Sequence, residues 1–442
     1  MAHPFSLHPT LAAHLKPSPT LFINERVTQL WAEGKTVYHL GFGESRFPVH
    51  PKLNAALAAN IQQTSYLPTQ GLPALRTAIA DFYTKQMKLP TTAAQVIVAS
   101  GSKPLLWALQ MALDADLILP TPSWVSYAPQ ARLLQRNVHY IPANAADGYA
   151  LTLDALDQTV RQSSNPSKLL LLNSPNNPGG WMIEPSQLAE ICNYCRQHNI
   201  LIGSDEIYAL TAHGNRPHVS PAHYYPEGTV VFGGLSKHLS LGGWRLGVAV
   251  LPAGESGDLL MRGMKVIAGE IWSSPAAPIQ YAAVAAYQED AEITDYIATC
   301  AKVHAVRTQH LWSWLVEFGI PCAEPQGAFY LFPNFDPWKE ALAAKGVHTS
   351  DDLASHLLEE YQIATLPGTA FGVPAHELSL RLATSYVDME SEEKAAHLLA
   401  AWQTNPNPQQ LMEEHHPVMQ ETIRRFGAFI DGLQDGLRGE NG

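Results

Sequence analysis

Residues 168–208 read KLLLLNSPNNPGG (168–180), WMIEPSQLAEICNYCRQHN (181–199) and ILIGSDEIY (200–208). The first and third pieces are apolar runs that end in polar turn residues, and the middle piece carries apolar side chains at helical spacing. Strand, helix and strand in this order are typical of two parallel neighbours joined by a crossover helix. Unbroken apolar runs, in place of alternating ones, indicate strands that are covered on both faces.

The same pattern extends outward from this stretch. Further apolar runs bounded by turn residues are QVIVASG (95–101), ADLILPTP (115–122), TVVFGGLSK (229–237) and LGVAVLP (246–252). Helical periodicity lies between many of them, which predicts an α/β fold with a mostly parallel sheet and helices on both faces. Ligands in such folds bind outside the carboxyl ends of the strands, where these runs end in polar or glycine-rich turns.

From about residue 300 the pattern changes. A long helical stretch is followed by strand-like GAFYLFPNF (327–335), a helix, IATLPGTAFG (363–372) and LSLRLATSY (378–386). This order predicts a second, smaller α+β domain that part of the N-terminal region joins. We expect an N-terminal segment over residues 1–45, a large domain over 46–298, a small domain over 299–404 and a helical extension over 405–442.

The expected extension begins with the helix-breaking run TNPNPQQ (404–410). After it, apolar residues recur at alternating steps of four and three, which gives one apolar stripe on a helix. We expect this stripe to dock on the body of the chain; docking on a partner subunit is the alternative. The stripe consists of Met419, Ile423, Phe426, Ile430, Leu433 and Leu437.

Composition and charge limit the classes of function that fit the chain. The 442 residues are 46% hydrophobic and carry a net charge of −12, which suits a large globular enzyme. A chain without a basic surplus is a poor partner for nucleic acid or an anionic membrane. No apolar run reaches the length of a membrane span, and the N-terminus lacks the features of a signal peptide. We therefore expect no nucleic acid or membrane partner. We also expect no metal site.

The chain has only four cysteines, Cys192, Cys195, Cys300 and Cys322. That number is too small for a disulfide framework in a chain of this length, so reduced thiols and a cytoplasmic location are expected. Cys192 and Cys195 have the C-x-x-C spacing of a redox pair. They also share helical spacing with Leu188 and Ile191, which favours packed core thiols.

Candidate catalytic and ligand-binding residues follow the predicted strands. Lys237 follows an apolar strand, where desolvation would favour a neutral amine nucleophile, although a lysine that extends its stem over apolar surface has the same pattern. Gly101 and Ser102 follow another strand and open a helix, whose free amides suit a phosphate; a simple helix cap is the alternative.

Three further side chains fit an electron-sink cofactor. Asp205 at a strand end could keep a pyridine nitrogen protonated, Asn177 could bind a ring oxygen, and Trp124 could stack on a heteroaromatic ring. Their ordinary alternatives are a helix-capping aspartate, a turn asparagine and a core tryptophan. Together with Lys237 and the phosphate loop, they form the set that a pyridoxal phosphate site requires.

This set, in this order, resembles the fold-type I pyridoxal-phosphate enzymes, specifically the class I/II aminotransferases, over roughly residues 11–402. The resemblance implies a seven-stranded large-domain sheet, pyridoxal 5'-phosphate as cofactor and a homodimer with shared active sites. It implies that Lys237 forms the Schiff base and acts as general acid and base, with Asp205 and Tyr208 assisting. Cofactor contacts are implied for Tyr66, Gly101, Ser102, Lys103, Trp124, Asn177, Asp205, Tyr208, Lys237 and Arg245. Substrate contacts are implied for Gly43, Lys103, Trp124, Asn177 and Arg381.

The loop GSKP (101–104) and the segment LKPSPTLFINERVTQL (15–30) are similar to the bacterial aspartate/prephenate aminotransferase branch. Lys103 would there meet the distal carboxylate of an acidic substrate. Gly234 also matches that branch. The resemblance thus predicts transfer of an amino group from aspartate or another acidic amino acid to 2-oxoglutarate by a ping-pong mechanism. A solvated lysine at the start of a helix is the alternative role for Lys103.

Several positions depart from the family pattern. The usual NPTG reads NPGG with Gly179, and the usual GEPDF reads GESRF with Ser45 and Arg46. Arg46 could bind a carboxylate or form a surface pair, and Trp272 could reshape the side-chain pocket. Aminotransferases of aromatic, alanine-like or other neutral amino acids, and a C–S or β-lyase, remain alternatives. A DNA-binding regulator is disfavoured because the extension has no basic recognition helix.

Overall fold

The computed structural model describes residues 8–10 and 19–439 of the chain. The strands are β1 (Tyr38–His39), β2 (Val96–Ala99), β3 (Asp116–Pro120), β4 (Val138–Ile141), β5 (Lys168–Asn173), β6 (Leu201–Asp205), β7 (Thr229–Gly234), β8 (Gly247–Val250), β9 (Tyr330–Leu331), β10 (Ile363–Ala364), β11 (Leu366–Pro367) and β12 (Leu380–Ala383).

The helices are α2 (Pro19–Ala32), α3 (Pro51–Asn60), α4 (Pro73–Lys85), α5 (Ser102–Ala112), α6 (Tyr127–Leu133), α7 (Leu153–Gln162), α8 (Pro185–Gln197), α9 (Glu255–Ile271), α10 (Ala277–Tyr287), α11 (Ala291–Glu317), α12 (Lys339–Ala344), α13 (Ser350–Tyr361), α14 (Glu392–Thr404), α15 (Pro408–His415) and α16 (Pro417–Gly439). Short 3-10 turns are η1 (Ala93–Gln95), η2 (Ala145–Asp147), η3 (Ala209–Thr211), η4 (Pro221–His223), η5 (Pro226–Gly228), η6 (Gly242–Trp244), η7 (Asp336–Trp338) and η8 (Gly368–Phe371).

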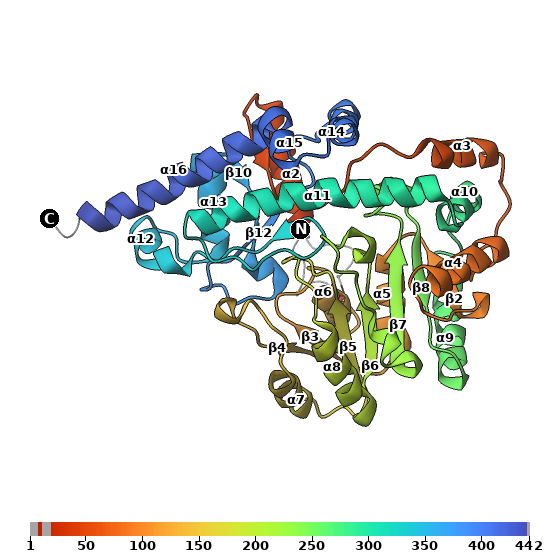
Figure 1. The fold of residues 1–442 in the computed structure, drawn as a ribbon. Helices are drawn as coiled ribbons and strands as arrows, with labels where there is room; N and C mark the ends of the chain where they lie inside the picture. The colour runs from red at the N-terminus through yellow and green to blue at the C-terminus, as the bar shows by residue number, and fades with distance from the viewer. Residues whose placement is uncertain (1–7, 11–18, 440–442) are drawn as a thin grey trace, which may run out of the picture.

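The main sheet has seven strands in the order β2-β8-β7-β6-β5-β3-β4 (Figure 1). β8 runs antiparallel to both of its neighbours, β2 and β7, and the other neighbouring pairs are parallel. The expected α/β fold with a mostly parallel sheet is therefore confirmed. Six of the seven strands coincide with the apolar runs quoted above, and β4 is the strand that those runs did not include.

Helices cover both faces of this sheet, and the apolar run of β5 shows why. Leu169 and Leu171 pack with α5, α6 and α9 on one face, whereas Leu170 and Leu172 pack with α7 and α8 on the other. Successive side chains of a strand point to opposite faces, so a strand buried on both sides is apolar at every position. The four leucines in a row thus account for the three-layer architecture.

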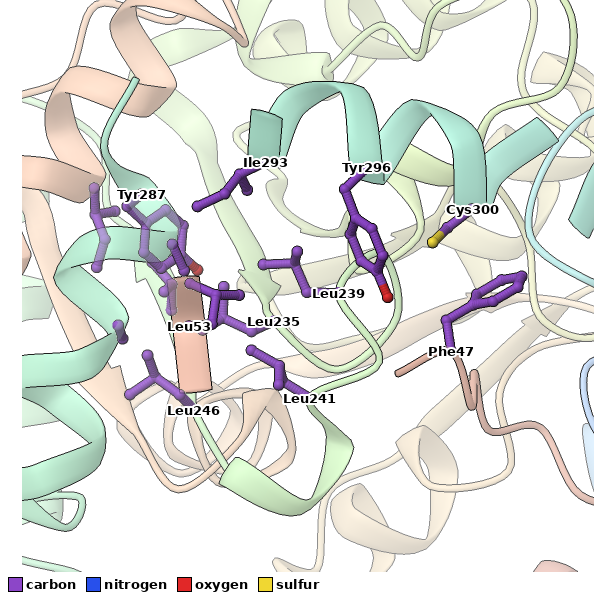
Figure 2. Packing of buried hydrophobic residues seen from close by; sticks show 14 of the residues in the cluster. Phe47, Leu53, Leu235, Leu239, Leu241, Leu246, Tyr287, Ile293, Tyr296 and Cys300 are labelled. Carbon is purple, nitrogen blue, oxygen red and sulfur yellow. The ribbon is translucent and has the colours of Figure 1, made fainter. Parts of the chain in front are cut away.

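A further core lies between the sheet and α4, α10 and α11. Figure 2 shows part of it: Leu235, Leu239 and Leu241, from the chain that follows β7, pack beside Tyr287 and other side chains of the helices. All three leucines are buried. Lys237 lies between Leu235 and Leu239 in the sequence, so this packing holds the backbone in place before and after Lys237.

Two small sheets form the second structural unit. β11, β12 and β9 make a three-stranded antiparallel sheet, and β1 pairs in parallel with β10. The β1–β10 pair joins part of the N-terminal region to the C-terminal half of the chain. The chain passes from β1 directly into Gly41–Phe47, which borders the candidate site described below.

Helix α11 is continuous over 27 residues and contacts both halves of the molecule (Figure 1). Its first half packs in the core beneath the large sheet through Ile293, Tyr296 and Cys300, and its second half packs with the small sheets through Leu311 and Leu315. The domain division expected at residues 298 and 299 falls inside this helix. That division remains a prediction.

Helix α16 docks on the body of the chain. Met419, Ile423, Phe426, Ile430 and Leu433 are buried in the core that α11, α12 and α13 share with the small sheets. The docking expected for the apolar stripe is confirmed for these residues, while the side chain of Leu437 lies outside the described part of the chain.

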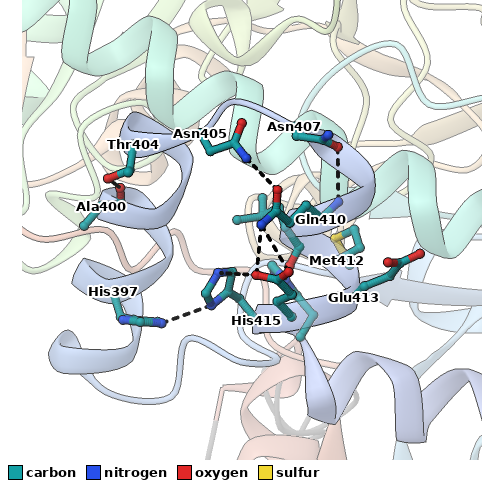
Figure 3. Close-up of polar contacts among 12 residues, drawn as sticks. His397, Ala400, Thr404, Asn405, Asn407, Gln410, Met412, Glu413 and His415 are labelled. Carbon is teal, nitrogen blue, oxygen red and sulfur yellow. Dashed lines mark hydrogen bonds and ion pairs between the residues drawn. The ribbon is translucent and has the colours of Figure 1, made fainter.

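Polar contacts fix the extension on both sides of α15. The carboxylate of Asp388 accepts the N–H groups of Val418 and Met419, each at 2.9 Å, which caps the start of α16. Figure 3 shows the α14–α15 turn. There the side-chain oxygen of Asn407 accepts the backbone N–H of Gln410 at 3.2 Å. Nε2 of His397 lies 3.1 Å from Nδ1 of His415. Asparagine caps of this kind explain why the run TNPNPQQ ends one helix and begins the next.

The four cysteines are free thiols. Cys192 and Cys195 are buried in the core beneath α8, and burial raises the pKa of the Cys192 thiol to about 12. A thiol that stays protonated is a poor nucleophile, so the prediction of packed core thiols is confirmed. Within the described residues, no helix combines the length and apolar character needed to cross a bilayer.

The docking of α16 predicts a large stability effect at its centre. Phe426→Ala removes a fully buried side chain and should lower the free energy of unfolding by about 3–5 kcal/mol. Arg424→Ala, on the exposed side of the same helix, removes only a surface ion pair with Glu421 and should lower the free energy of unfolding far less. Equal effects in denaturant unfolding would show that α16 is not part of the core.

Candidate active site

The candidate site lies at the carboxyl ends of β5, β6 and β7. The register pairs Asn173, the last residue of β5, with Asp205, the last residue of β6. The Asn173 side chain donates to the Asp205 carbonyl at 2.8 Å. A cavity of about 380 Å³ opens at this edge. Ten of the residues singled out from the sequence line it: Gly43, Ser102, Lys103, Trp124, Asn177, Asp205, Tyr208, Lys237, Arg245 and Arg381.

Lys237 projects into the cavity from the loop after β7. Its Nζ donates to the carbonyl oxygen of Gly43 at 2.8 Å. It also lies 5.6 Å from the ring centre of Tyr208 and 5.8 Å from that of Phe329. A carbonyl dipole and two aromatic faces can stabilise an ammonium without neutralising it.

The start of α5 and Arg245 form an anion-binding corner. Gly101 precedes α5 with φ of 99°, and a Cβ at this position would lie 2.4 Å from Nη2 of Arg245. Only glycine therefore allows the guanidinium to lie against the start of the helix. Arg245 donates to the carbonyl of Gly242 at 3.0 Å and to that of Ser100 at 3.4 Å. Free helix amides and a guanidinium together suit a phosphate.

Asp205 is a buried carboxylate with few partners. The Tyr127 hydroxyl donates to its Oδ2 at 2.7 Å, and the Ile207 N–H donates to its Oδ1 at 3.3 Å. Burial raises the pKa of Asp205 to about 6, although the bond from Tyr127 acts in the opposite direction. A positively charged ligand group beside it would relieve this cost of burial.

Asn177 and Tyr208 complete this side of the cavity. The Asn177 N–H donates to the Asn173 side chain at 2.7 Å, whereas Asn177 Oδ1 is buried and has no hydrogen-bond partner. The Tyr208 hydroxyl lies 2.8 Å from that of Tyr330, and burial raises the pKa of Tyr208 well above its usual value. A buried amide without a partner is costly, so a ligand with a polar atom fits here.

Arg381 and Lys103 add positive charge. Arg381 is buried and donates to the carbonyl of Gly41. Its guanidinium lies 4.9 Å from the ring centre of Tyr330, and burial lowers its pKa. The exposed side chain of Lys103 carries its Nζ to 5.0 Å from the ring centre of Trp124. Loss of hydration, followed by repulsion from Arg245 and Lys237, lowers the pKa of Lys103.

The cavity therefore has an excess of positive charge in a chain whose net charge is −12. Within residues 8–10 and 19–439, none of Lys103, Lys237, Arg245 and Arg381 forms an ion pair with a carboxylate. Asp205 and Glu44 supply the negative charge in the cavity wall, and Glu44 pairs with Arg46 at 3.5 Å. Unpaired cations around a cavity indicate a ligand with several negative charges.

Other singled-out residues lie elsewhere. Gly101 supports Arg245 from behind the cavity wall, and Tyr66 is 97% exposed on the protein surface. Arg46 pairs with Glu44 and lies 5.1 Å from the ring centre of Tyr386, as in a surface pair. Trp272 follows α9 and packs against the core of α5 and α9. Neither Arg46 nor Trp272 lines the cavity.

The departure at Gly179 has a packing cause. A Cβ at this position would lie 1.6 Å from the ring of Trp181. The ring of Trp181 stacks on Tyr149 with centroids 5.5 Å apart and an interplanar angle of 15°. Trp181 thus requires glycine at 179, and the NPGG loop keeps Asn177 in the cavity.

Sequence reasoning missed several residues of the wall. Tyr127 binds Asp205, Tyr330 binds Tyr208, and Ser236 and Phe42 line the cavity. Tyr127 lies three residues after Trp124, which the sequence singled out, but its bond to Asp205 was not predicted. Tyr330 lies in the strand-like GAFYLFPNF, where nothing in the sequence distinguishes a site tyrosine from a core one.

Comparison with known proteins gives the family. A family model described as aminotransferase class I and II matches residues 35–399. The chain belongs to this family. It is therefore an aminotransferase, and pyridoxal phosphate is its cofactor. The match ends before α15 and α16.

Individual relatives give the branch. An aspartate aminotransferase from Geobacillus stearothermophilus is 36% identical over 394 residues, which cover 87% of this chain and 96% of the relative. An aspartate/prephenate aminotransferase from Cereibacter sphaeroides is 32% identical and covers 82% of this chain and 90% of the relative. A solved aspartate aminotransferase from Thermus thermophilus with maleate superposes with a TM-score of 0.80 at 26% identity over 96% of this chain and 99% of that one. The aminotransferase is of the aspartate aminotransferase type.

The cavity of the aminotransferase fits pyridoxal phosphate. The buried Asn177 Oδ1 without a partner, the buried carboxylate of Asp205 and the amides that open α5 match the polar groups of a phosphorylated pyridine. The unpaired cations match its negative charge. The donor set of this chain is thus consistent with the cofactor of its family.

The raised pKa of Asp205 predicts a pH-dependent stability of the cofactor-free aminotransferase. Between an unfolded pKa of about 3.9 and the folded value of about 6, the folded protein holds a proton that the unfolded chain releases. The contribution of Asp205 is therefore fully present below about pH 4 and is lost as the pH rises through about 6. Asp205→Asn should raise the thermal midpoint relative to wild type at about pH 8 and not at about pH 4.5.

Asp116 provides a control of opposite sign. Burial alone would raise its pKa, but hydrogen bonds from Ser163, His139 and Asn137 lower it overall. Asp116→Asn should therefore lose stability at about pH 8. If Asp205→Asn raises the thermal midpoint equally at both pH values, burial of the ionised Asp205 carboxylate does not destabilise the protein.

Proposed function

We propose that the chain transfers the amino group of an acidic L-amino acid, aspartate foremost, to 2-oxoglutarate by a ping-pong mechanism. The observation that carries the proposal is the pair of unpaired cations, Arg381 and Lys103, in one cavity. A dicarboxylic amino acid has two carboxylates to place, and the acceptor has the same two. A buried or half-desolvated cation favours a carboxylate and penalises an apolar side chain.

The cofactor would be held by the residues that fit it. Backbone amides at Gly101, Ser102 and Lys103, together with Arg245, would bind its phosphate, and Trp124 would stack on its ring. Asp205 would bind the ring nitrogen, while Asn177 and Tyr208 would bind the ring oxygen. Pyridoxal phosphate, when bound, supplies a pyridine ring that withdraws electrons from the substrate Cα.

Lys237 is the proposed covalent attachment point and the proton carrier. Its Nζ would take the proton from the substrate Cα as general base and deliver it, as general acid, to the C4′ carbon of the cofactor. The buried leucines on either side of Lys237 limit the movement of its backbone, while the unbranched stem lets Nζ move. Tyr208 keeps its hydroxyl proton, because burial raises its pKa, and can donate to a ring oxygen.

Arg381 orients the substrate. Its guanidinium can bind the α-carboxylate through two parallel bonds, while the aromatic faces of Tyr330 and Phe371 limit its rotation. The backbone of Gly43 borders the same part of the cavity. Fixing the carboxylate in this way sets the direction of the Cα–H bond relative to the cofactor ring.

We further propose a cytoplasmic homodimer with shared active sites. Tyr66 is 97% exposed, which suits a residue that reaches the phosphate of a neighbouring subunit. Other large apolar side chains are exposed on α5 and α9, namely Met111, Leu259, Val266 and Ile271. Leu259 and Val266 are two helical turns apart on one face, as expected for an interface.

Replacing Lys103 tests the substrate class. Lys103→Met keeps most of the length of the side chain and removes the charge. We expect kcat/KM for aspartate to fall by about 10- to 100-fold and that for alanine to change little, since one charge-assisted bond is lost. The exposed Lys85, changed to Met, is the matched control. Equal losses for both amino acids would assign Lys103 to the cofactor alone.

The same assays separate the reaction classes. Without an acceptor, an aminotransferase converts each bound cofactor once, which a single-turnover spectrum records, and Lys237→Ala abolishes the change. A lyase instead releases ammonia and pyruvate continuously. An aromatic or other neutral amino acid that reacts faster than aspartate and glutamate would favour the neutral-substrate alternative.

Two valines test the dimer. Val266 on α9 is 68% exposed and Val316 on α11 is 46% exposed. Val266→Asp should shift the sedimentation of the holoenzyme towards a monomer and weaken cofactor binding at least about tenfold, because a charge in an apolar interface is costly. Val316→Asp should leave the assembly unchanged. A monomeric wild type, or the reverse pattern, would contradict the proposed interface.

A further inference from the structure

A polar cluster that is buried except for one half-buried serine, Ser240, lies behind the cavity wall. It consists of Ser45, Ser240 and His304, which come from the segment after β1, the loop after Lys237 and the middle of α11. Ser45 Oγ lies 2.6 Å from Ser240 Oγ and 3.0 Å from His304 Nε2. Ser45 is 2% exposed and His304 is 1% exposed. Hydrogen bonds in such a dry environment are strong, and breaking one leaves a buried group without a partner.

The hydrogen bonds of the cluster have one direction. Burial, then the positive charge of Arg307, lowers the pKa of His304 well below its usual value, so the ring is neutral and carries one N–H. Nδ1 of His304 is buried and has no hydrogen-bond partner. An unpaired acceptor costs less at this position than an unpaired N–H donor, so the proton is on Nε2, which donates to Ser45. Ser45 then donates to Ser240, whose oxygen also accepts the N–H of Phe47 at 3.1 Å.

The cluster holds a segment that contacts two residues of the cavity. In the segment Gly41–Phe47, the carbonyl of Gly41 accepts from Arg381 and that of Gly43 accepts from Lys237 at 2.8 Å. Ser45 is two residues from Gly43, and Ser240 is three residues from Lys237. The bond between the two serines therefore joins the substrate-side backbone to the loop that carries Lys237.

We propose that Ser45, Ser240 and His304 are positioning residues that hold the backbone of Gly43 in place beside Lys237 and Arg381. The inference rests on the proposed function in assigning Arg381 to the α-carboxylate. In the pattern GEPDF of the family that the sequence resembles, the third position is proline, and this chain has Ser45 there. Proline restricts the backbone by its ring, and serine does not, so the hydrogen bonds to Ser240 and His304 supply the restraint in its place.

This role differs from that of Lys103 in its effect on substrates. The α-carboxylate is common to all amino acids, so loss of the cluster should affect acidic and neutral substrates equally. Loss of Lys103 should affect acidic substrates alone. The ratio of kcat/KM for aspartate to that for alanine thus separates the two roles.

The test uses the holoenzyme variants Ser45→Ala, Ser240→Ala and the double variant. Each single change should lower kcat/KM for both amino acids about fivefold, the factor of one typical hydrogen bond, and leave their ratio unchanged. The double variant should lose less than the sum of the two single losses, because both changes remove the Ser45–Ser240 bond, while each also removes one bond of its own, from His304 or from the Phe47 N–H. Amide hydrogen exchange of residues 41–47, a readout independent of turnover, should become faster in all three.

The histidine is tested by two replacements. His304→Phe keeps the ring contacts with Phe47 and Phe329, whose centroids are each 4.8 Å away, and loses the donor. It should behave like Ser45→Ala. His304→Gln retains an N–H donor and should restore slow exchange at residues 41–47. This pair of variants also decides the matter if Ser45→Ala does not fold.

Ser163→Ala is the matched control. Ser163 is a buried serine that donates to Asp116 at 2.7 Å, at the opposite edge of the main sheet. Its loss should lower the thermal midpoint without changing the exchange of residues 41–47 or kcat/KM. The proposal is overturned if Ser45→Ala behaves in the same way, or if the two serine changes are additive. If aspartate is not a substrate but exchange at 41–47 responds as expected, the acidic-substrate proposal fails and the positioning role stands.

Discussion

The structure depends on holding positive charge in a cavity without neutralising it. Lys237 is stabilised by the Gly43 carbonyl and two aromatic faces, and Arg381 by the Gly41 carbonyl between Tyr330 and Phe371. Arg245 is bound by carbonyl groups as well. Carbonyl dipoles and ring quadrupoles lower the cost of burying a cation, while a carboxylate would cancel its charge. The attraction for anionic ligands is thereby preserved.

The fold brings these neutral partners together from distant parts of the chain. Parallel strands end at one edge, so the register of β5 with β6 places Asn173 next to Asp205. The carbonyls that hold Lys237 and Arg381 come instead from the segment after β1, which the β1–β10 pair ties to the small sheets. The cavity is therefore a junction of two structural units, and the cluster of Ser45, Ser240 and His304 lies directly behind that junction.

Sequence patterns predicted the parts of the structure that are local. The apolar runs predicted six strands of the main sheet because each is buried on both faces, whereas β4, with His139 and Tyr140 only half-buried at the sheet edge, is too polar to stand out. Asn177, Asp205 and Lys237 were found because each follows such a run. Tyr330 and the partner of Ser45 could not be found, since their contacts cross 122 and 195 residues of sequence. Nothing in the sequence explains Gly179 in place of the usual threonine, whereas the structure shows that the ring of Trp181 leaves no room for a side chain.

Helix α11 has a mechanical consequence. Its 27 residues extend about 40 Å, and one rigid rod therefore enters the cores of both the large and the small sheets. A flexible linker would permit a free hinge between the two units, but a continuous helix does not. Any change in their relative angle must occur by sliding of side chains along α11, which is shear motion, or by bending of the helix itself. His304 lies near the middle of α11, so such sliding would displace the residue that donates to Ser45.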